Sequence, residues 1–181
     1  MVLENMRVLV TKRMLREGLF RCLEHTSIDK VSVSELCRES GINRATFYNH
    51  YDTPKDILVE LGWEAAKELK TLFAGRLVIS QRDMVVQCLT LLRKNKREVK
   101  AIVAASADES LVSSTLEMFR WLLGDGNDLR ERFNLKDEVE YDLTVRCFGS
   151  MAYNLIRRWI VEDVDKTPEE IADLFIRLAG M

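Results

Sequence analysis

The sequence predicts an all-α protein, with an N-terminal three-helix domain of the helix-turn-helix kind and a larger C-terminal helical domain. Apolar residues make up 47% of the 181 residues, whereas glycine and proline number only 8 and 2, so little interrupts helices. Apolar side chains recur at steps of three and four residues along most of the chain, which is the spacing of one helix face. The stretch from Ser32 to Tyr51 has the layout of two short helices joined by a tight turn.

The first three expected helices follow from apolar spacing and from end signals. Apolar positions mark the first helix over residues 11–25. Ser32 is an N-cap for the second helix, and Glu35 three residues later completes a capping box. Gly41 tolerates the left-handed backbone of a C-cap, and Asn43 is a good N-cap for a third helix over residues 44–51. In this layout the last helix is the one that enters the major groove of DNA.

The third expected helix carries an unusual set of side chains for a helix that only packs. Arg44, Thr46, Tyr48, Asn49 and His50 cannot all be buried without hydrogen-bond partners. Side chains of these types supply the hydrogen bonds used on phosphates and base edges. DNA binding is one interpretation of this pattern. A polar surface helix of a bundle is the other, because such spacings also arise by chance in all-α proteins.

The rest of the chain predicts further helices. Thr53 as N-cap and Pro54 at the first helical position start a long helix that ends at Gly75. This helix is continuous with the N-terminal domain, so we place the domain boundary near its start, giving domains 1–55 and 56–181. A turn is expected at residues 124–128. Apolar spacing indicates the other helices at residues 82–94, 97–106, 109–123 and 138–162.

Residues 11–58 combine a Leu-Phe-containing first helix with the run GINRATFYNHY at residues 41–51. This combination resembles the N-terminal domain of the TetR family of transcriptional regulators. The form of the run from Asn43 to His50 is similar to the subgroup that includes activators of dihydroxyacetone-utilisation genes. The resemblance implies a homodimeric DNA-binding regulator that reads a palindromic operator in double-stranded DNA. Whether it represses or activates transcription stays open.

The resemblance also assigns roles to single residues. It implies that four side chains face DNA: Thr46, Tyr48, Asn49 and His50. Tyr48 and His50 would lie on phosphates, and Arg44 is our candidate for a base contact, since arginine pairs bidentately with guanine. A lysine that contacts phosphate in most of the family falls at Pro54 here, so the neighbouring Lys55 is the candidate for that role.

The last two helices predict a second interface. Thr167, Pro168 and Glu170 give the final helix an N-cap, a first-turn proline and a capping-box glutamate. The helix before it is apolar on more than one side and therefore needs a partner besides its own core. Residues 148–175 resemble the C-terminal part of the same subgroup, where two helices pair across a twofold axis. The candidate dimer residues are Phe148, Ala152, Leu155, Ile156, Trp159, Leu174, Phe175 and Leu178.

An effector site is expected in the C-terminal domain from the resemblance alone. The candidate lining residues are Cys88, Phe119, Trp121, Met151 and Tyr153, and each of them also suits the plain core of a helical domain. Members of the subgroup also respond to a protein partner, so the effector is a small-molecule inducer or a protein co-regulator. A basic cluster within residues 93–100 is a solvated helix corner, an anionic effector site or a second phosphate contact.

Composition limits the other classes. The net charge is −2, with +2 on residues 1–55 and −4 on the remainder, so only locally placed cations can attract DNA. The four cysteines are scattered, and we expect reduced thiols in a cytoplasmic protein. No apolar run approaches the roughly 20 residues of a membrane span, and no metal site or cofactor is indicated.

Two further classes remain as alternatives. An enzyme is not expected, because the sequence contains no phosphate loop, nucleophile motif or metal quartet and only two histidines. A helical protein–protein adaptor whose helix-turn-helix no longer binds DNA is the stronger alternative. The displaced lysine and the low basic charge favour that alternative.

Overall fold

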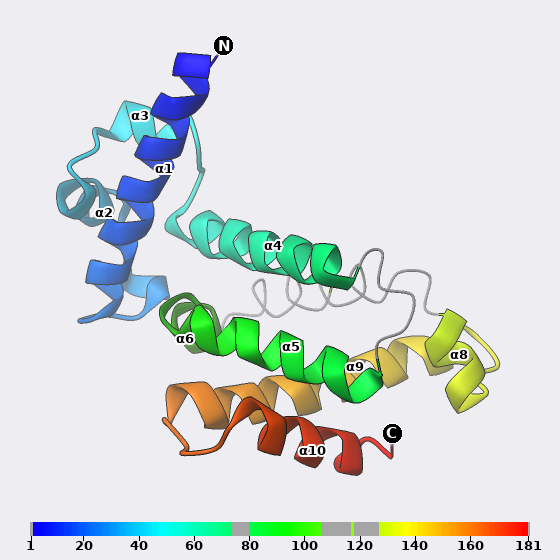
Figure 1. Cartoon of the computed structure of the whole chain (residues 1–181). Coiled ribbons are helices and arrows are strands. Elements are labelled where there is room, and N and C mark those ends of the chain that lie inside the picture. The colour runs from blue at the N-terminus through cyan, green and yellow to red at the C-terminus, as the bar shows by residue number, and fades with distance from the viewer. Residues whose placement is uncertain (1, 74–79, 106–116, 118–126, 181) are drawn as a thin grey trace.

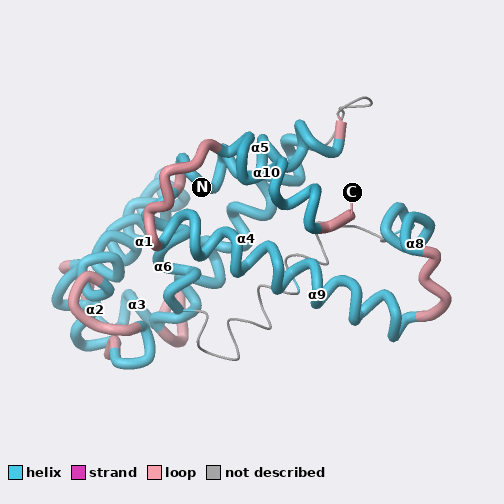
Figure 2. The backbone as a smooth tube through the Cα atoms, turned by 90° about the horizontal axis from the view of Figure 1, so that it is seen from below, coloured by secondary structure: helices cyan, strands magenta, loops and turns pink. Residues whose placement is uncertain are grey.

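The computed structural model describes residues 2–73, 80–105, 117 and 127–180, and within these ranges the chain forms helices and no strands. Figures 1 and 2 show an elongated molecule with helices α1 to α3 at one end and α8 at the other. We call α1 to α3 and their connections the head, and α5 to α10 the body. Helix α4 leads from one to the other. The all-α fold expected from the sequence is confirmed.

The head begins with α1 (Val2–Leu23), which starts well before the expected residue 11. A short 3-10 turn, η1 (Ile28–Lys30), leads to α2 (Val33–Ser40). Ser32 caps α2 as predicted, because its Oγ accepts a hydrogen bond from the Glu35 amide at 3.2 Å. Gly41 ends the helix in the left-handed conformation with φ of 70°.

The third helix is shorter than the expected span of residues 44–51. Helix α3 covers Arg44–Tyr48, and Asn43 caps it as predicted through a 2.7 Å bond from the Thr46 amide to its Oδ1. The amides of His50 and Tyr51 both bond to the carbonyl of Phe47. These bonds close the helix and turn the chain toward α4 (Pro54–Phe73).

Helix α4 and part of the body complete the apolar core of the head. Phe47 is fully buried, together with residues of α1, α2 and α4. Leu61 of α4, and Ala101 and Ala105 of the body, belong to the same apolar cluster. The domain boundary at residue 55 stays a prediction, and the head's core extends beyond it.

The body has its own apolar core and is built from α5 (Gln81–Lys94), α6 (Lys96–Ala105), α8 (Asn127–Phe133), α9 (Glu138–Ile156) and α10 (Pro168–Leu178). Helix α10 packs along α5, as Figure 1 shows. Helix α9 continues into η2 (Arg157–Val161), a π-helical turn that buries Trp159 and Ile160. The full capping box predicted at Thr167 and Glu170 is present at the start of α10.

Two parts of the body differ from expectation. Asn127 and Asp128 begin α8, although the sequence predicts a turn at residues 124–128. The chain from 138 to 161 is helical as expected, but its last turn is π-helical. The expected end of α4 at Gly75 and most of the expected helix at 109–123 lie outside the described residues. In the described part of the chain, no helix has the length and apolar character needed to span a bilayer.

Candidate DNA interface

Helix α3 is held rigidly on its inner side and is open on its outer side. Phe47 is 0% exposed and anchors the helix in the head's core, while the Asn43 cap fixes its first turn. Arg44, Tyr48 and Asn49 are exposed. Tyr48 is 56% exposed, and its ring packs edge-on against that of Phe47, with ring centroids 5.3 Å apart. The helix therefore presents donors and an aromatic ring on a fixed backbone.

The other residues predicted to face DNA lie at the margins of this outer side. Thr46 and His50 are half-buried. The His50 ring lies 6.4 Å from the ring of Tyr51, which is buried. The structure thus brings all five polar residues of the predicted recognition helix together in one short segment, with three exposed and two partly covered.

Arg44 is not extended into solvent in this structure. Its Nη2 donates a hydrogen bond to Oγ of Ser34, which lies in the first turn of α2. Burial raises the pKa of the Cys37 thiol on α2, and the positive charge of Arg44 opposes that rise. Arg44 therefore lies over the second helix of the motif. Ser34 is not among the residues indicated by the sequence, since a lone exposed serine in a helix carries no signal of its own.

Lys55, the second residue of α4, lies close to η1, the short turn that connects α1 and α2. Its Nζ lies 3.0 Å from Oδ1 of Asp29, and its side chain is one-third exposed (33%). A phosphate would have to compete with this carboxylate for the ammonium group. Asp56 accepts hydrogen bonds from the amides of Asp52 and Thr53 at 2.9 and 2.8 Å, which places another negative charge at this corner.

A polar network behind α3 joins the recognition segment to α1 and α4. Glu60 of α4 accepts hydrogen bonds from Lys12 and from Arg16 of α1, the latter at 3.1 Å, and from the Tyr51 hydroxyl. Burial alone would raise the pKa of Glu60, but these three donors outweigh it and lower the pKa. Burial, the hydrogen bond to Glu60 and its charge together raise the pKa of Tyr51. Glu60 is therefore a carboxylate that holds the chain just after α3 in place.

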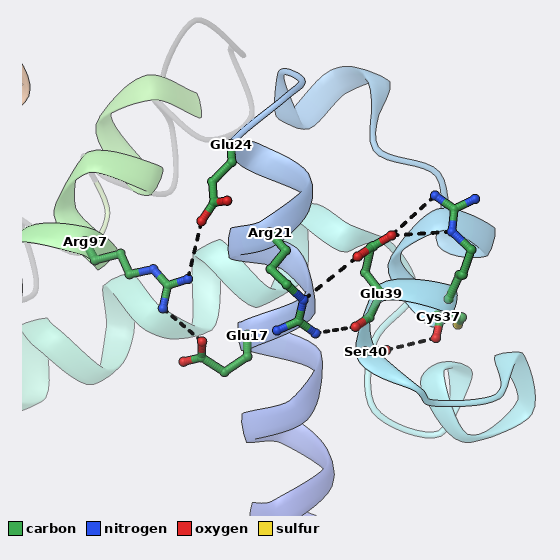
Figure 3. Close-up of polar contacts among 8 residues, drawn as sticks. Glu17, Arg21, Glu24, Cys37, Glu39, Ser40 and Arg97 are labelled. Carbon is green, nitrogen blue, oxygen red and sulfur yellow. Dashed lines mark hydrogen bonds and ion pairs between the residues drawn. The ribbon is translucent and has the colours of Figure 1, made fainter.

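Most cations of the basic cluster at residues 93–100 make contacts within the chain itself. Arg93 donates to the Lys166 carbonyl at 2.6 Å and lies over the Trp159 ring. Lys96 and Lys100 both pair with Asp163. Arg97 pairs with Glu17 of α1 at 2.9 Å, as Figure 3 shows. These contacts favour the solvated-corner interpretation over an anionic effector site.

Three of the candidate effector residues, Cys88, Met151 and Tyr153, lie in the described part of the chain. Cys88 lies in α5, where burial raises the pKa of its thiol to about 12. Met151 is half-buried in α9, and the Tyr153 hydroxyl donates to the Val103 carbonyl at 3.3 Å. Phe119 and Trp121 lie outside the described residues. Cys88, Met151 and Tyr153 line neither of two hollows in the described ranges, which lie between α1 and α2 (about 280 Å³) and beside Trp159 (about 30 Å³).

The candidate dimer residues occupy α9, η2 and α10, and one of them needs correction. Trp159 is only 3% exposed, and its Nε1 donates to the Lys166 carbonyl at 2.8 Å. Its indole belongs to the apolar core of the protomer, so it is not available to a partner chain. Leu178 is 61% exposed. The remaining candidates are half-buried: Phe148, Ala152, Leu155, Ile156, Leu174 and Phe175.

Fold and site together define a class. The chain is an all-helical protein with an N-terminal helix-turn-helix, whose third helix is exposed, joined by α4 to a helical body. Residues 81–180, more than half of the chain, match the TetR family described as "Transcriptional regulator C-terminal region". The chain belongs to the TetR family of transcriptional regulators. Among curated protein sequences, none matches the chain.

Solved structures share this fold along nearly the whole chain. A TetR transcriptional regulator from Streptococcus agalactiae is 18% identical, covers 98% of both chains and superposes with a TM-score of 0.66. A TetR-family regulator from Syntrophomonas wolfei is 12% identical over 96% of this chain and 94% of its own, with a TM-score of 0.72. The dihydroxyacetone kinase operon activator DhaS is 16% identical over 94% of each chain, with a TM-score of 0.55. At these identities the likeness concerns the fold.

Proposed function

We propose that the protein is a homodimeric transcriptional regulator that reads a palindromic operator through α3. The observation that carries the proposal is the outer side of α3, where Arg44 and Tyr48 are exposed on a helix fixed by Asn43 and Phe47 and the C-cap residue Asn49 is exposed beside them. A rigid helix with exposed hydrogen-bond donors meets the requirement for reading base edges in the major groove. Such a regulator would act in the cytoplasm, without catalysis and without a resident cofactor or metal.

The proposed division of labour follows the chemistry of each side chain. Arg44 would pair with a guanine, because its planar fork matches the two acceptors of that base. Tyr48 and His50 would bind phosphates, with Thr46 and Asn49 beside them. Lys55 would add a phosphate contact only after leaving Asp29. The head is mildly basic, so we expect few phosphate contacts and weak non-specific binding.

Dimerisation would occur through α9 and α10. The candidate surface comprises Phe148, Ala152, Leu155, Ile156, Leu174, Phe175 and Leu178, which are exposed or half-buried in the single chain. A twofold dimer can place two copies of α3 about 34–36 Å apart, so that they enter successive major grooves. Two half-sites are needed because one short helix contributes little affinity.

Control would come from a small-molecule inducer or a protein co-regulator that acts on the body. Cys88, Met151 and Tyr153 remain candidates for an inducer site, together with Phe119 and Trp121. We also propose membership of the subgroup of dihydroxyacetone-utilisation activators, which the sequence run at 43–50 supports. Continuous helix α4 would carry a change in the body to the head.

The test is selection of bound duplexes from a random pool at ~150 mM salt, where non-specific binding is weak. We expect the wild-type protein to enrich a palindrome and Arg44→Ala to relax one base preference, with a loss of about 1–3 kcal/mol in binding free energy. Arg158→Ala is the matched control, an exposed arginine of the body. No enrichment even at low salt would overturn the proposal.

The alternative function is a protein–protein adaptor with a helix-turn-helix that does not bind DNA. The pairing of Lys55 with Asp29 and the charge of −2 favour it. It predicts that no duplex is retained at physiological salt and that Arg44→Ala and Tyr48→Ala leave partner binding intact. The same selection therefore separates the two functions.

A further inference from the structure

We propose that Ser34 of α2 is a positioning residue for DNA recognition, whose hydroxyl orients the guanidinium of Arg44 toward its base. This inference rests on the proposed function, since it concerns how α3 reads DNA. It names a residue outside the third helix as a determinant of specificity.

The geometry brings the first turns of α2 and α3 together. Ser34 is the second residue of α2, and Arg44 is the first residue of α3. Both helix starts are fixed by side-chain caps, Ser32 on one and Asn43 on the other. Between them, Gly41 sets the turn with φ of 70°. The hydrogen bond from Arg44 Nη2 to Ser34 Oγ therefore connects two positions whose backbones are already held in place.

Two further observations agree with a guanidinium held over α2. The charge of Arg44 also opposes the rise in the pKa of the Cys37 thiol of α2. Arg44 and Ser34 are both exposed, so their hydrogen bond forms at the protein's outer surface, where DNA would approach.

The arrangement leaves most of the arginine's capacity free. A guanidinium has five N–H donors, and one hydroxyl occupies a single donor of Nη2. The remaining donors suffice for the two acceptors of guanine, O6 and N7. The serine would thus fix the direction of the fork before DNA arrives, and less side-chain freedom would be lost when the complex forms.

The opposite role would be restraint, in which Ser34 holds Arg44 away from DNA. The two roles predict opposite signs. If the serine orients the fork, Ser34→Ala weakens operator binding by about two- to tenfold, the range expected for ordering one flexible side chain. Restraint predicts tighter binding by Ser34→Ala.

The experiment compares four full-length proteins in duplex selection and in titrations of the selected operator: wild type, Ser34→Ala, Ser34→Thr and Ser27→Ala. Ser34→Thr keeps the hydroxyl and should restore wild-type recognition. Ser27→Ala is the matched control, because Ser27 is an exposed serine of the head whose side chain makes no capping bond. Thermal melting of each variant checks that the head is folded.

These measurements distinguish a role of Ser34 in orienting Arg44 from a role in stabilising the fold of the head. We expect Ser34→Ala to lose preference at the one base pair that Arg44→Ala also affects, while the slope of affinity against salt is unchanged because no phosphate contact is lost. An unchanged base preference and affinity, or tighter binding, would overturn the inference while leaving the proposed function standing. If the wild type itself enriches no duplex, the proposed function fails, and the inference fails with it.

Discussion

Gly18 allows α1 and α2 to cross more closely than any side chain would permit. A Cβ added at Gly18 would lie 2.7 Å from Cβ of Ser40, and 2.9 Å from both the Cα and the amide nitrogen of Ser40. Ser40 is 5% exposed, and its hydroxyl donates to the Cys37 carbonyl. Two of the three contacts are with backbone atoms, so rotation of a side chain cannot relieve them.

We therefore expect Gly18→Ala to destabilise the protein by about 1–3 kcal/mol, the usual effect of overpacking a tight contact. The methyl group would force α1 and α2 apart and disturb the packing behind α3. The midpoint of urea unfolding measures this change, with Ser27→Ala as an exposed reference substitution. A midpoint equal to that of the wild type would show that the crossing can widen without strain.

Glu60 is the second position where a single side chain holds the head together. Its side chain is 26% exposed and contacts Lys12, Arg16 and Tyr51. We expect Glu60→Gln to lower the free energy of unfolding at pH 7 by about 1–3 kcal/mol, because charged and hydroxyl donors lose a carboxylate acceptor. Glu68→Gln, an exposed substitution on the same helix, is the control.

The pH dependence of this effect has a definite sign. The folded protein lowers the pKa of Glu60 below the ordinary value of 4.5, so the unfolded chain takes up the proton first as the pH falls. The stabilisation by Glu60 is complete above the ordinary value and is lost as the pH falls through the folded-state value. The difference between wild type and Glu60→Gln should therefore shrink in acid. A difference that grows in acid would contradict the network.

At the scale of whole elements, α6 is fixed to the head on one side and to the end of α9 on the other. Arg97 pairs with Glu17 at 2.9 Å and approaches Glu24 at 3.9 Å, as Figure 3 shows. Its guanidinium also lies 4.7 Å from the centroid of the Phe20 ring. On the other side, Lys96 and Lys100 pair with the Asp163 carboxylate beyond η2.

We expect Arg97→Ala to loosen the contact between α1 and α6 with little change in global stability, because half-exposed ion pairs contribute up to about 1 kcal/mol. Amide hydrogen exchange should accelerate in α6 and in the last turns of α1. Arg82→Ala is the matched control, since Arg82 pairs with Asp173 inside the body. Exchange that accelerates equally in both variants would argue against a specific link between head and body.

Elements differ in how far the sequence predicts them. The caps at Ser32, Asn43 and Thr167 are predictable because a capping bond joins residues three positions apart. The sequence does not indicate α8, a helix of 7 residues that begins within a turn-like run. The sequence does not indicate the π-helical turn either, because the apolar residues of that segment keep a spacing that fits an α-helix. Trp159 lies within this turn and is buried, which removes it from the predicted interface.

The same limit applies to the site. The polar residues of α3 are recognisable because they are consecutive and unusual for a packing helix. Ser34 and Glu60 are not recognisable in the sequence, because the residues that form hydrogen bonds with them lie outside their own helices. Arg44 is 10 residues from Ser34, and Lys12 is 48 residues from Glu60. Periodicity and capping rules do not cover contacts at such separations.

At the scale of the whole molecule, the distribution of charge and of exposed apolar residues favours a dimer over a monomer. Three cations of the basic cluster, Lys96, Arg97 and Lys100, form ion pairs within the chain, so the cluster adds little attraction for DNA. One mildly basic head would bind weakly, and a second head is the available source of affinity. Leu178 of α10 is 61% exposed and continues the half-buried residues Leu174 and Phe175.

We expect Leu178→Glu to convert the proposed dimer to a monomer while the single chain keeps its fold, because the side chain contributes little to the protomer's own core. Leu9→Glu is the matched control, a leucine of α1 that is 63% exposed and lies outside the proposed interface. Sedimentation equilibrium measures the oligomeric state, and circular dichroism checks the helix content. Loss of the dimer should also abolish binding to the palindrome. The affinity of Leu178→Glu for a single half-site should be no higher than that of the wild type. If Leu178→Glu still forms dimers, the interface does not include the end of α10. If Leu9→Glu loses the dimer to the same extent, part of the interface lies on the head.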